Sequence, residues 1–165
     1  MFKLTISRLR LLLLSLPYYI AVGFGIGFLQ YMPGTFGTLL MGVPSYILIS
    51  YLTIRYYIII VFLGILLGIR ICSLAERVLH EADAPAIIWD EVCGYWLTML
   101  GAPTGITWIV VGFFAFRFFD IVKPWPINLI QQKVHGGLGI MLDDIMAAIY
   151  ASCIIHACAY IVSQE

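Results

Sequence analysis

Charged residues are scarce in this sequence. Of its 165 residues, 11% are charged, and nine basic side chains balance nine acidic ones to give a net charge of zero. Soluble domains carry about 25% charged residues, so this chain lacks the side chains that would cover a surface in water. It also lacks a basic stripe interleaved with aromatic residues, which argues against nucleic acid as a partner.

Cysteine is sparse as well, and its positions do not form the pattern of a zinc site or of a disulfide framework. The four cysteines lie in or beside apolar runs, at Cys72, Cys93, Cys153 and Cys158. We therefore predict buried free thiols. The sequence also lacks a linker, a low-complexity tract and an internal repeat, so we expect a single integral membrane domain over residues 1–165.

Hydrophobic residues, by contrast, are abundant and continuous. They make up 62% of the chain, and the mean hydropathy is +1.02. Their runs do not alternate with polar residues, which indicates membrane helices rather than strands. We predict an all-α, polytopic membrane protein with about five membrane helices, near residues 38–54, 56–72, 86–102, 105–119 and 140–162.

Two segments do not fit a simple crossing. Residues 11–30 are long enough to cross once, but Pro17 and three glycines interrupt them, so we predict an N-terminal segment that lies in the interface or re-enters. The helices at 86–102 and 105–119 are short, because a crossing needs about 20 residues. Either their ends are buried in protein or the part inside the membrane begins late.

Basic residues are distributed unevenly under this topology. All four polar motifs of the chain fall on one face, because an even number of crossings separates each from the next. If the N-terminus lies on that face too, the face carries eight of the nine basic residues and leaves Arg55 alone on the other: Lys3, Arg8, Arg10, Arg70, Arg77, Arg117, Lys123 and Lys133. By the positive-inside rule, the motif face is cytoplasmic.

Two of the motifs place carboxylates beside apolar helices. Asp90 and Glu91 open a helix that then becomes wholly apolar, and an ionised group near hydrocarbon requires a partner. A helix start stabilised by the helix dipole is the simpler explanation, but the dipole stabilises an acidic side chain there by only about 0.3–1 kcal/mol. Arg117, Asp120 and Lys123 are spaced by three and share a helix face. They form either a local ion-pair ladder or a metal-binding carboxylate between two phosphate-binding cations.

The stretch from His135 to Asp144 is the most informative motif. Its glycines, Gly136, Gly137 and Gly139, allow a loop to approach a ligand closely, and the following helix start would direct N–H groups at an anion. Asp143 and Asp144 would repel a phosphate there unless a divalent cation lay between them. A glycine-rich helix cap with acidic residues matched to the dipole is the alternative.

Three further features are read more simply. Thr35 and Thr38 lie in a Pro-Gly motif that a turn with Thr38 as N-cap also explains. The connector with His80, Glu81 and Asp83 is expected to be a solvated loop. His156, within the last apolar run, is expected to be a hydrogen-bonded interior histidine.

Taken together, these motifs resemble the phosphatidylglycerophosphatase A family of bacterial inner-membrane lipid phosphatases. The resemblance rests on four segments in the family's order: residues 33–38, residues 89–94, residues 116–126 and residues 135–144. It implies a multi-pass protein of the bacterial inner membrane, with its active site facing the cytoplasm, that hydrolyses phosphatidylglycerophosphate to phosphatidylglycerol with Mg²⁺. Residues 28–30 and Thr38 depart from the family's usual pattern but leave the acidic motifs intact.

Our hypothesis assigns a role to each polar residue of the motifs. Asp90 and Asp144 are expected to be catalytic and Glu91, Asp120 and Asp143 to bind the metal. The phosphate is expected to be bound by cations, hydroxyls and backbone N–H groups, from Lys123, Arg117, His135, Gly136, Gly137, Gly139, Thr35 and Thr38. The sequence does not decide which carboxylate is the base.

Two other functions remain open at this level. Helices that are broken by glycine and carry acidic residues also describe ion-coupled transporters, and a phosphatidyl-group transferase would act on a related lipid. The expected partners are the lipid substrate and the lipids of the membrane. Nothing in the sequence indicates a protein partner.

Overall fold

The computed structural model describes residues 15–164, and this part of the chain contains helices and no strand. Residues 15–21 are helical. They are followed by η1 (Gly23–Phe28), α2 (Pro33–Gly37), the π-helix η2 (Thr38–Gly42), α3 (Val43–Ser50), α4 (Ile54–Leu79), α5 (Trp89–Thr98), α6 (Ile106–Val122), α7 (Ile127–Lys133) and α8 (Gly136–Val162). The all-α prediction is therefore confirmed.

Two of the described helices, α4 and α8, are long and apolar enough to cross a membrane. They contain 26 and 27 residues, which corresponds to about 40 Å at 1.5 Å per residue, against a hydrocarbon core of about 30 Å. Helix α6 has 17 residues and α5 has ten. The expected count of about five membrane helices is thus met only in part, by two helices.

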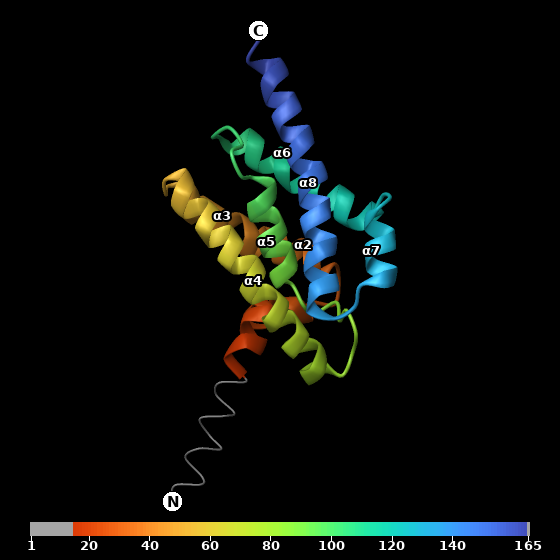
Figure 1. The fold of residues 1–165 in the computed structure, drawn as a ribbon. Coiled ribbons are helices and arrows are strands. Elements are labelled where there is room, and N and C mark those ends of the chain that lie inside the picture. The colour runs from red at the N-terminus through yellow and green to blue at the C-terminus, as the bar shows by residue number, and fades with distance from the viewer. Residues whose placement is uncertain (1–14, 165) are drawn as a thin grey trace, which may run out of the picture.

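Helix α5 is buried in the middle of the molecule. It contacts η2, α3, α4, α6 and α8 (Figure 1), and side chains on every side of it are buried, including Val92, Cys93, Tyr95 and Trp96. At 1.5 Å per residue, ten residues span only about 15 Å. Of the two explanations for the short hairpin, burial within protein is therefore correct for α5.

Aromatic residues tie α5 to its neighbours through their polar atoms. The Tyr57 hydroxyl donates to the Trp96 carbonyl oxygen at 2.6 Å, and Trp96 Nε1 donates to Ser45 Oγ at 2.9 Å. The Tyr95 hydroxyl donates to the Ile109 carbonyl oxygen at 3.0 Å. A polar group without a partner is costly in apolar surroundings. These bonds therefore help to fix α5 relative to α3, α4 and α6.

Two helices begin earlier than the sequence suggested. The first long helix begins at Pro33 rather than near 38, and Thr38 lies inside it with helical φ and ψ of −60° and −45°. Thr38 is not an N-cap, because its hydroxyl donates to the Gly34 carbonyl oxygen at 2.9 Å. Helix α8 begins at Gly136 rather than near 140. The glycine-rich stretch thus forms the first turn of α8 instead of a loop before it.

The N-terminal segment turns back within the described residues. η1 contains Phe24 and Gly25 at φ of 52° and 107°, which redirects the chain after residues 15–21. The Ile88 N–H donates to the Ala21 carbonyl oxygen at 2.8 Å, so this segment lies against the connector before α5. Residues 1–14, with Lys3, Arg8 and Arg10, lie outside the described residues, and the path of residues 11–30 in the membrane stays a prediction.

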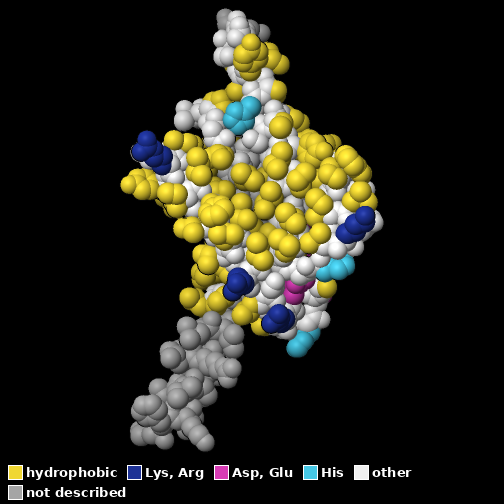
Figure 2. Space-filling view, in the orientation of Figure 1, with side chains coloured by type: hydrophobic (Ala, Val, Ile, Leu, Met, Phe, Trp, Pro, Cys, Tyr) yellow, Lys and Arg dark blue, Asp and Glu magenta, His cyan; other side chains and the backbone are white. Residues whose placement is uncertain are grey.

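The surface of the molecule is largely hydrophobic. Figure 2 shows a band of apolar side chains across the middle of one face, with most of the charged side chains toward one end. Cys72 and Cys93 are buried as expected, whereas Cys153 and Cys158 are exposed. His156 is also exposed rather than interior, although its Nδ1 lies 2.8 Å from the Ser152 carbonyl oxygen.

Replacing Gly137 with alanine should destabilise the fold. Gly137 brings α8 against α4, and a Cβ atom there would lie 2.1 Å from the Ile69 carbonyl oxygen. Backbone cannot yield as a side chain can, so Gly137→Ala should lower the free energy of unfolding by about 1–3 kcal/mol. Gly42→Ala is the matched control, because its nearest neighbours would be 3.5 Å away. Thermal unfolding in detergent tests this; equal midpoints for the two variants would contradict it.

Candidate active site

A cavity of about 440 Å³ lies where the acidic motifs converge. Five segments line it: residues 32–35 at the start of α2, residues of the connector before α5, the first turn of α5, the last turns of α6 with Lys123, and one face of α8. Its size is typical of small-molecule pockets, which are about 300–1,000 Å³. The fold therefore brings residues from distant parts of the sequence to one pocket.

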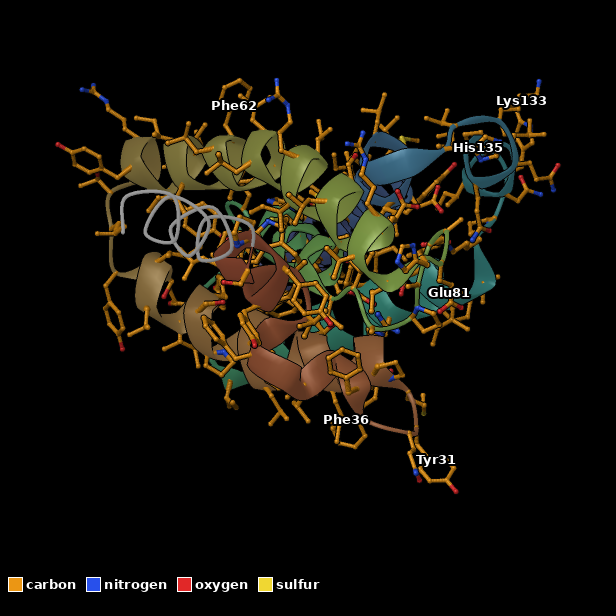
Figure 3. All side chains as sticks on the ribbon, turned by 90° about the horizontal axis from the view of Figure 1, so that it is seen from below. Tyr31, Phe36, Phe62, Glu81, Lys133 and His135 are labelled. Atoms are coloured by element: carbon orange, nitrogen blue, oxygen red, sulfur yellow. The ribbon has the colours of Figure 1, made fainter. Side chains whose placement is uncertain are left out.

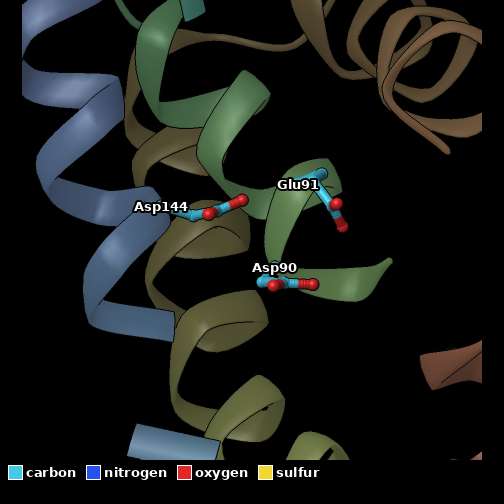
Figure 4. A group of neighbouring side chains, drawn as sticks. All are labelled: Asp90, Glu91 and Asp144. Carbon is cyan, nitrogen blue, oxygen red and sulfur yellow. The ribbon is translucent and has the colours of Figure 1, made fainter. Parts of the chain in front are cut away.

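Three carboxylates meet at the base of this pocket. Each of Asp90, Glu91 and Asp144 offers an oxygen, and these oxygens all lie within 4.8 Å of one another (Figure 4). Asp90 and Glu91 come from the first turn of α5, and Asp144 comes from α8. One oxygen on each of them is buried without a hydrogen-bond partner. This donor set fits a divalent metal ion, which takes carboxylate oxygens as ligands.

The charge of the pocket supports the same conclusion. Six acidic side chains line it against two basic ones, Arg117 and Lys123. If all are ionised, four negative charges remain without compensation. A phosphate would be repelled from such a site, whereas a bound divalent cation would reduce the excess and attract it.

Arg117 joins the helix α6 to the carboxylates. Its Nη1 lies 2.6 Å from Asp120 Oδ2 and 3.8 Å from Glu91 Oε1, and the Arg117 and Asp120 side chains are each only 12% exposed. Its buried Nε has no hydrogen-bond partner. Asp120 therefore orients the guanidinium, which still has a donor available for a phosphate oxygen.

Lys123, which also lines the pocket, is paired with Asp143. Its Nζ donates to Asp143 Oδ2 at 2.9 Å, and the residue ends α6 in the left-handed conformation, with φ of 45° and ψ of 60°. Burial acts to lower the pKa of Lys123, but the hydrogen bond and the negative charge of Asp143 outweigh it, so the pKa is raised. Lys123 therefore stays positively charged at neutral pH.

The two adjacent acidic residues of α8, Asp143 and Asp144, consequently have different partners. Neighbouring residues on a helix point about 100° apart. Asp144 joins the carboxylate cluster of α5, whereas Asp143 accepts a hydrogen bond from Lys123. The structure thus separates one acid that can hold a metal ion from one that holds a cation of the protein.

Glycines allow the pocket walls to approach this closely. A Cβ atom on Gly34 would lie 2.0 Å from Glu91 Oε1 and 3.1 Å from Arg117 Nη2. A Cβ atom on Gly94 would lie 2.6 Å from the Phe116 ring and 3.2 Å from the Cβ atom of Asp144. A side chain at either position would displace these groups, so both glycines favour the close approach of the pocket walls.

Comparison with known proteins agrees with this geometry. The family model of phosphatidylglycerophosphatase A matches residues 19–159. Proteins named phosphatidylglycerophosphatase A from Escherichia coli and Haemophilus influenzae are 39% and 38% identical over 152 residues. These alignments cover 91% and 92% of this chain, and 86% and 93% of the relatives. The chain belongs to the phosphatidylglycerophosphatase A family.

A third relative carries another name. A Bacteroides thetaiotaomicron protein described as a candidate phosphatidylinositol-3-phosphatase is 31% identical over 154 residues, which cover 89% of this chain and 96% of that protein. No solved structure matches the chain. With its two long apolar helices, this member of the phosphatidylglycerophosphatase A family is a membrane-associated phosphatase.

Not every residue expected at the site lies in the pocket of this phosphatidylglycerophosphatase A member. The carboxylates, Arg117, Lys123 and Thr35 all line it, and Thr35 Oγ1 is buried without a hydrogen-bond partner. Five other residues do not line it: Thr38, His135, Gly136, Gly137 and Gly139. His135 is exposed and lies beside Lys133 on the edge of the molecule opposite Tyr31 (Figure 3).

Close packing between backbone segments explains why glycines occur in this group. The Gly137 N–H donates to Ser73 Oγ at 3.0 Å, so α4 occupies the position that we had expected a phosphate to take. A Cβ atom on Gly139 would lie 2.2 Å from the Val134 carbonyl oxygen. The structure therefore does not support a phosphate-binding glycine loop at residues 136–139, because these residues serve close approach between backbone segments.

Asp83 is a pocket residue that the sequence did not reveal. It is exposed in the connector before α5, as expected of a solvated loop, and it also lines the pocket. Its N–H donates to Glu76 Oε1 at 2.9 Å, and its Oδ2 accepts from Gln131 Nε2 at 3.3 Å. The connector has no hydrophobic periodicity, so no pattern in the sequence could have indicated which way Asp83 faces.

Removing one carboxylate should weaken metal binding. Asp144→Asn keeps the size of the side chain but removes its charge, and even the loss of an outer partner of a metal site costs about 10–100-fold in affinity. We expect Asp144→Asn to weaken Mn²⁺ binding more than about tenfold in isothermal titration calorimetry of the purified protein. The matched control is Glu81→Gln, an exposed residue of the connector. Equal affinities for Asp144→Asn and the wild type would rule out this metal site.

Proposed function

We propose that this chain hydrolyses the terminal phosphate monoester of phosphatidylglycerophosphate, giving phosphatidylglycerol and inorganic phosphate. The observation that carries the proposal is the pocket itself, in which three clustered carboxylates face two cations that are held by other acids. Family membership supports the choice of lipid. The proposed cofactor is Mg²⁺, a hard cation that prefers oxygen ligands and often binds together with phosphate.

Asp90, Glu91 and Asp144 would hold the ion. When bound, Mg²⁺ would polarise the phosphate and lower the pKa of a water molecule. Asp90 Oδ1, buried without a donor, is the proposed acceptor of the proton from the attacking water. Asp120 and Asp143 were expected to bind the metal, but in the structure Asp120 forms an ion pair with Arg117 and Asp143 accepts a hydrogen bond from Lys123. We therefore assign them to positioning Arg117 and Lys123.

The cations and one hydroxyl would bind the substrate. Arg117 has an unpartnered Nε, and the Thr35 hydroxyl is buried without a partner, so both can donate to phosphate oxygens. Lys123 lines the same pocket and compensates the charge of the phosphate. Because these donors are preorganised by Asp120, Asp143 and the close contact at Gly34, they can stabilise charge that develops during hydrolysis.

The transporter and transferase alternatives find no support in the comparisons, which name only phosphatases. The inositide substrate in the name of one relative makes headgroup choice the relevant question. Assays should therefore offer phosphatidylglycerophosphate and phosphatidylinositol 3-phosphate side by side. We expect faster phosphate release from the former.

The carboxylate cluster should be essential for activity. Asp90→Asn, Glu91→Gln and Asp144→Asn should each lower kcat for phosphatidylglycerophosphate at least 100-fold, the order of loss seen when one stabilising group of a transition state is removed. Inorganic phosphate release, with Mg²⁺ and with chelator, measures this, and chelator should abolish the wild-type reaction. Glu81→Gln should retain wild-type turnover. Wild-type turnover in any of the three cluster variants would refute its assigned role.

We further propose a single multi-pass domain in the inner membrane of a bacterium, with the pocket facing the cytoplasm. Helices α4 and α8 are antiparallel candidates for crossing, because Gly137 at the start of α8 packs on Ile69 and Ser73 in the C-terminal half of α4. This places Arg77 and Lys133 at one end and Arg55 at the other, in agreement with the positive-inside rule. Helix α6, the helix at 33–50 and a re-entrant segment before it would complete the multi-pass protein.

Thiol labelling tests this orientation. In a variant without native cysteines, Arg55→Cys should react with a membrane-impermeant maleimide in intact spheroplasts. Lys133→Cys should react only after the membrane is permeabilised, because it is predicted to face the cytoplasm. Both positions are exposed in the structure. The reverse labelling pattern would invert the proposed topology.

A further inference from the structure

The mouth of the pocket has an apolar side. Met32 and Ile121 both line the cavity, yet each is 60% exposed. A side chain that lines a cavity and also faces outward lies at its opening. Met32 precedes α2, and Ile121 lies in the last turn of α6. Two hydrophobic side chains from different helices therefore border the entrance to a pocket whose interior is strongly polar.

The apolar character continues outward from both residues. On α6, Phe114 and Phe118 are exposed in the turns before Ile121. On the other side, Figure 3 shows Tyr31 and Phe36 pointing outward from the segment that carries Met32. In a membrane-associated protein, exposed aromatic and aliphatic side chains of this kind contact lipid. The entrance is thus continuous with surface that suits the hydrocarbon of the bilayer.

Charged side chains also line the pocket. Among them are Asp83, Lys123 and Asp143, and Asp83 is linked to Gln131 of α7. The pocket therefore has two different borders, one suited to hydrocarbon and one suited to water. A soluble phosphate ester would gain nothing from the apolar border, whereas an amphiphilic ester would match both.

The size of the pocket points to the same kind of ligand. A cavity of about 440 Å³ accommodates a phosphorylated glycerol headgroup but not two long acyl chains as well. The chains of a lipid whose phosphate reaches the carboxylate cluster must therefore leave through the mouth. Of the two borders, only that formed by Met32 and Ile121 can contact them without burying charge against hydrocarbon.

We infer that Met32 and Ile121 form a lateral portal through which the diacylglycerol part of the substrate extends from the pocket into the bilayer. The inference rests on the proposed function and adds to it a route of entry and a preference for acylated over soluble phosphate esters. The portal binds acyl chain near the glycerol backbone, while the carboxylate cluster, Arg117 and Lys123 act on the phosphate.

The test compares one lipid with its own headgroup. The ratio of kcat/KM for dioleoyl phosphatidylglycerophosphate to kcat/KM for the same molecule without acyl chains measures what the chains contribute. The double variant Met32→Ser with Ile121→Ser should lower this ratio about tenfold, through a higher KM for the lipid, because contact with apolar surface is lost.

The matched control replaces the adjacent residues. Tyr31 and Val122 are 79% and 55% exposed but do not line the pocket, so Tyr31→Ser with Val122→Ser should leave the ratio unchanged. Equal effects of the two double variants would overturn the portal, as would a wild-type ratio near one. A wild-type protein that releases phosphate from neither molecule would instead contradict the proposed function, and the portal with it.

Discussion

Repulsion among Asp90, Glu91 and Asp144 is the interaction that the surrounding structure must balance. Their oxygens lie within 4.8 Å of one another in a chain that is 62% hydrophobic. At an effective dielectric constant of about 20, each ionised pair at this distance is repelled by about 3 kcal/mol or more. The positive end of α5 offsets only part of this energy. The cation proposed for this pocket would therefore relieve the repulsion as well as take part in the chemistry.

The helices around the cluster are arranged to keep it intact. α5 is short and buried, so its first turn is fixed by contacts with α4, α6 and α8 rather than by its own length. Gly94 lets α5 approach α8 at Asp144, and Gly34 lets the start of α2 approach Glu91. Asp120 and Asp143 are used to hold Arg117 and Lys123. Each element next to the cluster thus either narrows the space or supplies a compensating charge.

Much of this could be predicted from the sequence. The features that could not be predicted were missed for physical reasons. Long apolar runs predicted helices, and acids in an apolar chain marked the pocket, because both follow from solvation. Hydropathy does not distinguish a helix buried in protein from one buried in lipid, so α5 was taken for a membrane helix. Glycine permits a loop around an anion and close contact between helices equally well. Only the neighbours of Gly137, on α4, show which applies.

Helix α6 connects the chemistry to the membrane. Arg117 and Asp120 face the pocket, Lys123 follows at the end of the helix, and Phe118 and Val122 on the same two turns are exposed. One turn of helix rises about 5.4 Å, so the cations and the apolar mouth at Ile121 are separated by little more than that rise. In a phospholipid, the charged phosphates and the acyl chains are likewise joined through a short glycerol unit. The register of one helix can therefore help to position both ends of the same molecule.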